Sequence, residues 1–168
     1  MTTDRARALA DRLIRNVDAI EKTSEVREPL YETLCARLAI GTAATKLGLS
    51  IDIVAPGKRS CPYHFHHAQE EFFVVLDGEG TARVAGEWLP LKTGDVLFVP
   101  AGPEYPHQIV NTSDRPLKYL SVSTRETPEI VEYPDSGKFL ARATRPDGDA
   151  FEAIQRTATN VDYWDGEP

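Results

Sequence analysis

The stretch FFVVLDGEGTARVAGEW, residues 72–88, indicates the fold class of this chain. An apolar run leads into the turn-forming pair Asp77-Gly78, and a short β-rich segment then reaches a second turn signal at Ala85-Gly86. Short segments of this kind, with turn signals roughly every 8 to 12 residues, are typical of a β-sandwich or β-barrel. The pattern continues over residues 45–57, 91–103 and 107–124, with a further turn signal at 114–116. The sequence therefore predicts an all-β domain.

The length and composition of the chain limit the classes to which it can belong. Its 168 residues, without an internal repeat, suit one domain with a substantial core. Hydrophobic residues make up 41% and charged residues 27%, as in an ordinary globular protein. No stretch approaches the roughly 18 apolar residues of a membrane helix, and charges throughout the N-terminal residues argue against a secretory signal. We therefore expect a cytoplasmic protein with no membrane partner.

Charge and cysteine content argue against two further classes. The net charge of −7 has the wrong sign for binding a phosphate backbone, and no basic cluster longer than Lys58-Arg59 offsets it. We therefore expect no nucleic-acid partner. Cys35 and Cys61 form neither a CxxC motif nor a disulfide framework, so we expect both to be reduced and packed as small hydrophobic side chains.

The hydrophobic pattern divides the chain into three segments. Apolar residues at helical spacing predict an amphipathic helix over residues 4–15, capped by Thr3 or Asp4. Such a helix needs a surface, so we expect residues 1–30 to pack on the barrel or on a second subunit. Residues 31–125 form the predicted barrel. Residues 126–168 are rich in turn formers and carry Tyr163 and Trp164, and we expect this C-terminal extension to dock on the barrel.

Two predicted strands are apolar on both faces. Phe72–Leu76 and Val96–Val99 lack the alternation of a strand that has one face in solvent. Their outer faces must therefore be covered, either by a second subunit or by the N-terminal helix and the C-terminal tail. A second subunit is the simpler of these, and we predict a homodimer.

The distribution of the four histidines suggests a metal site. His64, His66 and His67 fall within four residues, and His107 follows a later β-rich block. Residues i and i+2 of a strand project to the same face, so His64 and His66 point together and His67 points away. Neutral imidazoles suit Zn, Fe, Ni, Cu or Mn, and Glu71 can add a carboxylate. A lone histidine is more often an ordinary surface or core residue. The residues around these histidines therefore decide whether they are metal ligands.

That surrounding pattern resembles the two motifs of the cupin family. The first motif is matched by Gly57, six residues, His64-Phe65-His66, four residues, Glu71, six residues and Gly78. The second is matched by Gly94, five residues, Pro100-Ala101-Gly102, four residues, His107, three residues and Asn111. One extra residue before His64 and two before His107 depart from the family spacing, but loop insertions cost little. Glu70 competes with Glu71, yet only Glu71 places Gly78 after six residues.

The resemblance implies a single cupin barrel, that is, a double-stranded β-helix or jelly roll, with a short N-terminal helix and a C-terminal tail. It also implies one divalent metal ion (Fe, Mn, Ni, Cu or Zn) held by His64, His66, Glu71 and His107. Such an open site suits Lewis-acid or redox chemistry on a small oxygenated metabolite. Two functions stay open. The first is a metalloenzyme, either a dioxygenase or a sugar or sugar-phosphate isomerase. The second is a non-catalytic cupin that binds or senses a small molecule through its metal.

Catalytic residues beyond these ligands are not identified by the sequence. Tyr63, Tyr105, Gln108 and Arg83 are candidates for contacting a substrate, although such residues are more often ordinary parts of a strand or loop. Glu70 would serve as a general base only if it turned inward. It is one residue out of phase with Glu71, so we expect it to point outward, which favours an oxygenase or a binding protein over an isomerase.

Overall fold

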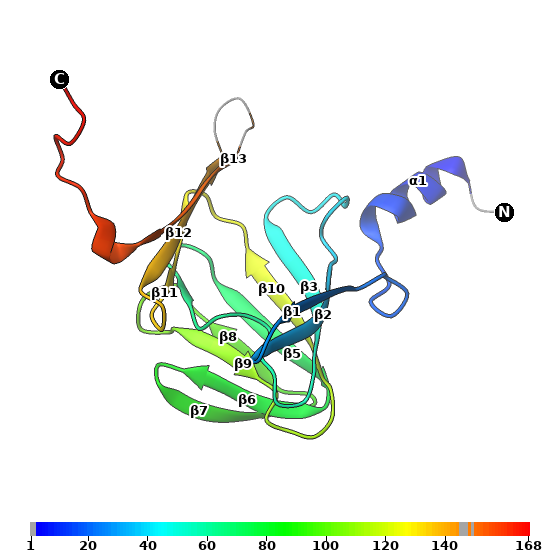
Figure 1. Ribbon diagram of the computed structural model, residues 1–168. Helices are drawn as coiled ribbons and strands as arrows, with labels where there is room; N and C mark the ends of the chain where they lie inside the picture. Colours follow the sequence, from blue (N-terminus) through cyan, green and yellow to red (C-terminus); the bar gives the residue numbers. More distant parts are fainter. Residues whose placement is uncertain (1–2, 145–147, 149) are drawn as a thin grey trace.

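Strands account for most of the regular structure in the computed structural model, which describes residues 3–144, 148 and 150–168 (Figure 1). The elements are α1 (Asp4–Leu13), β1 (Thr23–Arg27), β2 (Tyr31–Arg37), β3 (Leu47–Val54), β4 (Phe65–His66), β5 (Glu71–Asp77), β6 (Glu79–Val84), β7 (Glu87–Lys92), β8 (Val96–Val99), β9 (His107–Val110), β10 (Leu117–Thr124), β11 (Glu129–Tyr133), β12 (Lys138–Thr144), β13 (Ala150–Arg156) and the 3₁₀ turn η1 (Thr157–Thr159).

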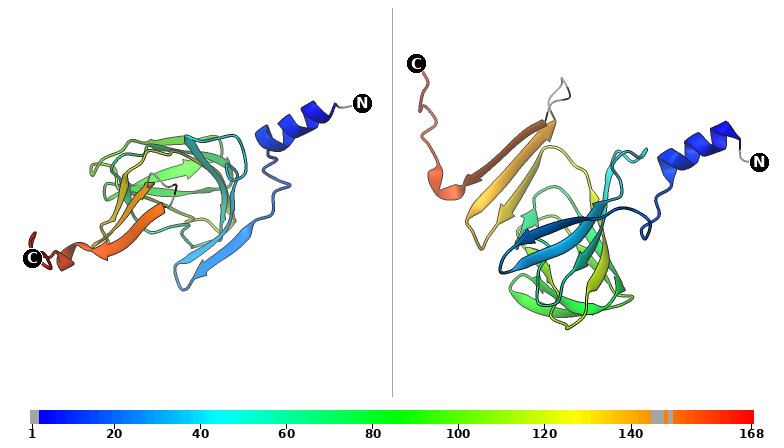
Figure 2. Two further views of the ribbon diagram at one scale, coloured as in Figure 1. Left: turned by 90° about the horizontal axis from the view of Figure 1, so that it is seen from above. Right: turned by 45° about the vertical axis from the view of Figure 1, so that its right-hand side comes forward.

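The strands of the described residues pair into three antiparallel sheets. Their orders are β1-β2-β3-β10-β5-β8, β13-β12-β11-β4 and β7-β6-β9. Seen from above, the sheets surround a common interior (Figure 2, left). Backbone hydrogen bonds between His64 and His107, with N···O distances of 3.1 and 2.7 Å, join the start of β4 to β9. The predicted all-β barrel is therefore confirmed.

Residues with positive φ lie at two of the predicted turn positions. Ala85 and Gly86, at φ 50° and 85°, connect β6 to β7, and a two-residue type I′ turn requires positive φ at both positions. Gly78, at φ 84°, connects β5 to β6. A Cβ at this position would lie 2.5 Å from the carbonyl oxygen of Pro116, so no other residue fits there without a shift of the backbone. The turn at Ala85-Gly86 is therefore a hairpin turn, whereas Gly78 forms a bend between β5 and β6, which belong to different sheets.

The main apolar core lies inside the barrel and draws on strands of the six- and three-stranded sheets. Its buried members are Val54, Phe73, Val75, Ala82, Leu91, Val99, Ile109, Leu117 and Tyr119. Beside it, the fully buried side chain of Asn111 donates to the carbonyl oxygens of Val54 and Arg115 and accepts from Ser113. These bonds fix the loop that leads from β9 into β10, because a buried amide is stable only when its polar atoms are paired.

The N-terminal helix forms where the apolar spacing predicts it, and it ends at Leu13. Thr3 caps it, since its Oγ1 accepts a hydrogen bond from the backbone N–H of Ala6 at 3.2 Å. No α1 residue is buried, and the helix projects away from the barrel (Figures 1 and 2). Leu9 and Leu13 are exposed, so none of the described residues covers the apolar stripe of α1.

The segment after α1 contacts the barrel. Val17 and Ile20 pack against Ala36, Leu38 and Ile51, which face outward from the six-stranded sheet. This segment therefore covers part of the outer face of the sheet. Within the described residues, no helix has the length and apolarity to cross a membrane.

The C-terminal residues extend the sheet that carries β4. Strand β11 pairs with β4 through Val131 and His66, and β12 and β13 continue the sheet outward (Figure 1). Tyr163 and Trp164 contact each other edge to face and are both exposed. The division into residues 1–30, 31–125 and 126–168 stays a prediction.

Candidate metal centre

The short strand β4 sets the directions of the three clustered histidines. Phe65 is buried in the core, whereas the side chains of His64 and His66 lie on the opposite side and approach each other with ring centroids 5.0 Å apart. His67 points away, and its Nε2 lies 2.7 Å from Oε1 of Glu132 at the surface. This arrangement follows from the alternation of side chains along an extended chain.

Glu71 lies at the centre of the histidine cluster. Its Oε2 is 2.8 Å from Nε2 of His107, 3.5 Å from Nε2 of His66 and 3.9 Å from Nε2 of His64. His64, His66 and Glu71 each offer one potential ligand atom, and these three atoms lie within 4.8 Å of one another. Such a group could hold a metal ion. His107 joins this group through its hydrogen bond to Glu71. Glu70 is exposed and its side chain lies outside the cluster.

The electrostatics of the cluster favour the protonation states that metal ligation needs. Burial opposes ionisation of Glu71, but its hydrogen bonds with His107 and His66 outweigh this effect and hold the pKa of the carboxyl below its usual range. Burial lowers the pKa of His107, which favours the neutral imidazole. An ionised carboxylate beside neutral imidazoles is a donor set that fits a divalent first-row ion.

Glu129 anchors the loop between the histidines and Glu71. Its buried side chain accepts hydrogen bonds from the backbone N–H groups of His67, Ala68 and Gln69 at 3.0, 3.2 and 2.9 Å. Its Oε1 also lies 3.4 Å from Nδ1 of His66. Glu129 therefore anchors the loop, and its carboxylate lies beside one imidazole of the cluster without a hydrogen bond to it.

A cavity of about 430 Å³ opens beside the cluster. His64, His66 and Glu71 line one part of it, and Ser50 and Asp52 of β3 line another. Further lining groups include Arg37, Cys35, Cys61, Gln69, Tyr119, Ser121, Ser123, Arg125 and Arg142. The cavity is thus polar over much of its wall and large enough for a small metabolite.

The two cysteines of this wall are weak nucleophiles. Burial raises the pKa of both the Cys35 and the Cys61 thiol to about 12, so each stays protonated near neutral pH. Both are free cysteines.

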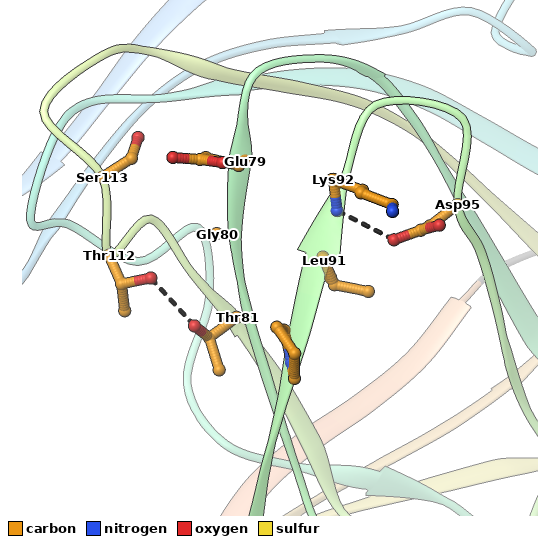
Figure 3. A pocket seen from close by; sticks show the side chains of 9 residues that line it. Glu79, Gly80, Thr81, Leu91, Lys92, Asp95, Thr112 and Ser113 are labelled. Atoms are coloured by element: carbon orange, nitrogen blue, oxygen red, sulfur yellow. Dashed lines mark hydrogen bonds between the residues drawn. The ribbon is translucent and has the colours of Figure 1, made fainter.

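A second cavity, of about 540 Å³, lies where β6 and β7 approach the loop after β9 (Figure 3). Its polar groups bond to one another: the hydroxyl oxygens of Thr81 and Thr112 lie 2.8 Å apart, and the Lys92 backbone N–H donates to Asp95 Oδ2 at 2.9 Å. None of the clustered histidines lines it. We therefore assign the candidate site to the cavity beside Glu71.

The four predicted substrate-contacting residues lie outside the lining of that cavity. Tyr63 is buried, accepts a hydrogen bond from the Gly86 N–H and stacks under the guanidinium of Arg83. Arg83 also forms a bidentate ion pair with Asp135. Gln108 is buried and donates to the carbonyl oxygen of Cys61, and Tyr105 is exposed while its carbonyl oxygen contacts Nδ1 of His107. Their role in catalysis stays a prediction.

Three residues at this site were not singled out by the sequence. The sequence does contain a signal that could have identified Asp52. It is an acidic residue between two isoleucines in LGLSIDIV, an otherwise largely apolar strand. Ser121 gave a weaker signal, since serines alternate with apolar residues along β10. Glu129 gave none, because its role depends on the approach of β11 to the loop after His66.

The structure so far defines a small β-barrel with a histidine–carboxylate cluster at a polar cavity. The family model of the cupin domain matches residues 50–123. An oxalate-binding protein from Thermotoga maritima is 36% identical over 103 residues, which cover 61% of this chain and 84% of that protein. The chain therefore belongs to the cupin superfamily, and the predicted cupin barrel is confirmed.

Two further proteins resemble this chain over different lengths. The crystal structure of a sugar phosphate isomerase of the cupin superfamily from Silicibacter pomeroyi is 26% identical, with a TM-score of 0.72, and the match covers 89% of this chain and 96% of that one. A glucose-6-phosphate isomerase from Pyrococcus horikoshii is 30% identical over 88 residues, which cover 45% of this chain and 46% of that protein. The chain thus spans about half the length of the Pyrococcus horikoshii isomerase.

Proposed function

We propose that this chain is a metal-dependent isomerase that acts on a small sugar or sugar phosphate. The observation that carries the proposal is the convergence of His64, His66 and His107 on the Glu71 carboxylate at the edge of a polar cavity. The likeness to the Silicibacter pomeroyi isomerase over nearly the whole length of both chains supports it.

In this proposal the four side chains hold one divalent ion, of Fe, Mn, Ni, Cu or Zn. A bound ion would supply a Lewis acid for a carbonyl or hydroxyl oxygen of the substrate. The chain's own contribution is to keep His107 neutral by burial, to keep Glu71 ionised, and to hold the loop after His66 through Glu129. The polar cavity wall then binds the substrate and limits how it can lie.

Turnover of sugar phosphates in deuterated buffer tests this proposal. The full-length protein, loaded in turn with Mn²⁺, Fe²⁺, Zn²⁺, Ni²⁺ or Cu²⁺, is mixed with aldose and ketose phosphates of five and six carbons. We expect at least one aldose–ketose pair to interconvert, as followed by proton NMR, and a His66→Ala variant to lose this turnover. Oxygen uptake without interconversion would instead identify an oxygenase, and the isomerase proposal would then be wrong.

A second candidate function is binding without turnover. The 36% identity to an oxalate-binding protein over 84% of that relative favours it. Calorimetric titration of the metal-loaded protein with oxalate distinguishes a binding protein from an isomerase. Metal-dependent oxalate binding, together with no turnover of any sugar phosphate, would support a binding protein.

We also propose that the protein is a homodimer that pairs through the outer face of β5 and β8. Phe98, Val96 and Leu76 on this face are 72%, 46% and 38% exposed, and Phe72 lies beside Phe98 with ring centroids 6.0 Å apart. Val17 and Ile20 cover the other part of the same sheet. A second copy of this face would bury these side chains, which monomers rarely leave exposed as one patch.

Light scattering after gel filtration tests the dimer. We expect wild-type protein to have twice the chain mass and Phe98→Glu to have the mass of one chain. Trp88→Glu, which changes an exposed aromatic residue on β7, serves as the control and should stay dimeric. A wild-type monomer at micromolar concentration would contradict the proposal.

A further inference from the structure

The inner face of β3 and β10 carries small polar side chains where a small barrel is usually filled by large apolar ones. Ser50 and Asp52 occupy inward positions on β3, and Ser121 and Ser123 occupy inward positions on β10. All four line the same cavity as the histidine–glutamate cluster. We call these four residues the hydroxyl wall. Large side chains at these positions would fill the space that is now the cavity.

Strand register connects the hydroxyl wall to the metal centre. Ser123 is the Cα partner of Glu71 across β10 and β5, and Ser121 is the partner of both Phe73 on β5 and Ser50 on β3. Side chains directly opposite each other in antiparallel strands have Cβ atoms about 5 Å apart. The hydroxyl groups therefore start beside the Glu71 carboxylate and lead across the sheet toward Asp52.

The polar atoms of the wall have unused hydrogen-bonding capacity. Ser50 Oγ donates to Asp52 Oδ2 at 2.7 Å, and among the described residues no side chain bonds the hydroxyl of Ser121 or Ser123. A carboxyl group offers about four acceptor positions, so the bonds from Ser50 and the Cys35 thiol leave about two free. A serine hydroxyl can both donate and accept a hydrogen bond, so it can pair with a hydroxyl group of a ligand in either direction.

Asp52 is the one buried carboxyl of this wall. It is 9% exposed, and no Lys, Arg or His nitrogen of the described chain lies within 4 Å of its oxygens. Its side-chain partners are Ser50 and the Cys35 thiol. Burial raises the pKa of this carboxyl, the effect expected of a carboxyl group that lacks a cationic partner. Keeping such a group buried is costly, and a ligand that donates hydrogen bonds to it would repay part of that cost.

We propose that the hydroxyl wall is a subsite that binds the hydroxyl groups of a polyhydroxylated ligand, with Asp52 accepting hydrogen bonds from two neighbouring hydroxyls. The ligand's other end lies at the histidine–glutamate cluster, so this inference rests on the proposed function for its metal-bound end. The wall selects against apolar groups, because an apolar ring would leave the serine hydroxyls and the Asp52 carboxyl unpaired.

Ligand-observed NMR on the full-length, metal-loaded protein tests this subsite. The probes are D-glucose 6-phosphate, D-fructose 6-phosphate, D-ribose 5-phosphate, inorganic phosphate and oxalate. We expect at least one of the three sugar phosphates to bind, and Asp52→Asn and Ser121→Ala each to weaken that binding about tenfold, as loss of a buried polar contact does. Oxalate, which is small enough to contact the metal centre alone, should bind both variants as it binds wild type.

Three controls keep this test specific. Asp165→Asn makes the same carboxyl-to-amide change in the exposed C-terminal segment and should leave all binding unchanged. The metal content and melting temperature of each variant show that the barrel and its ion are intact. If inorganic phosphate binds as tightly as the sugar phosphate, phosphate rather than hydroxyl recognition carries the affinity, and the subsite is overturned.

The subsite and the proposed function can fail independently. Weaker sugar phosphate binding by Asp52→Asn in a protein that shows no turnover would support the subsite and contradict the isomerase. Turnover with an unchanged KM and unchanged binding in both variants would support the isomerase and overturn the subsite. Wild-type protein that binds none of the three sugar phosphates would also overturn the subsite.

Discussion

Replacing His66 with alanine should remove bound metal from the purified protein, leaving less than about a tenth of the wild-type content. His66 is one of the three residues whose ligand atoms converge, and its Nε2 lies 3.5 Å from the Glu71 carboxylate. Loss of a direct ligand should weaken affinity by more than the roughly 10–100-fold that follows loss of a supporting residue. Elemental analysis of wild type and variant, prepared side by side, measures the effect.

His67→Ala provides the matched control for this experiment. It removes an adjacent imidazole that faces the surface and contacts Glu132, so the metal content should stay at the wild-type level. Equal metal content in all three proteins would show that the cluster does not bind the ion. A wild-type protein that cannot be loaded with any first-row divalent ion would also contradict the prediction.

A Glu129→Ala variant should lose both stability and metal affinity. The substitution removes the acceptor for the backbone N–H groups of His67, Ala68 and Gln69, so water must replace these bonds or they stay unpaired. We expect the free energy of unfolding to fall by about 2–4 kcal/mol. The metal affinity should fall by roughly 10–100-fold, because the loop connects His66 to Glu71.

Denaturant unfolding and metal titration of the same preparations measure the two effects of Glu129→Ala. Glu132→Ala removes a half-buried carboxylate of the same strand that contacts His67 at the surface, and it should alter stability by less than about 1 kcal/mol. If Glu129→Ala unfolds at the wild-type denaturant concentration, the bonds to the loop contribute little. The account of Glu129 as an anchor would then be wrong.

The fold could be predicted because its signals are local. The turn at Ala85-Gly86 is encoded by two adjacent residues, and the amphipathic helix by the spacing of residues such as Leu9 and Leu13. The choice of Glu71 over Glu70 followed from motif spacing, and the structure places Glu71 among the histidines because side chains alternate along a strand. Such features need no knowledge of distant contacts.

The rest of the site depends on tertiary contacts that no local pattern contains. Asp52 reaches the cavity only because β3 pairs with β10, and Glu129 reaches the loop only because β11 pairs with β4. The expectation that no inner carboxylate accompanies the ligands considered Glu70 alone and did not weigh Asp52. The candidates Tyr63 and Arg83 contact each other outside the cavity lining, an arrangement that also depends on tertiary contacts.

The residues of the centre come from three different sheets. His66 belongs to the four-stranded sheet, Glu71 to the six-stranded sheet and His107 to the three-stranded sheet. Glu71 already contacts His107 and His66 across these sheets. An ion held as proposed would add a cross-link that joins all three. Ion binding and folding are then thermodynamically linked, and a free ion concentration 100 times its Kd would add about 2.7 kcal/mol to stability. The availability of metal would thereby shift the balance between the folded and unfolded chain.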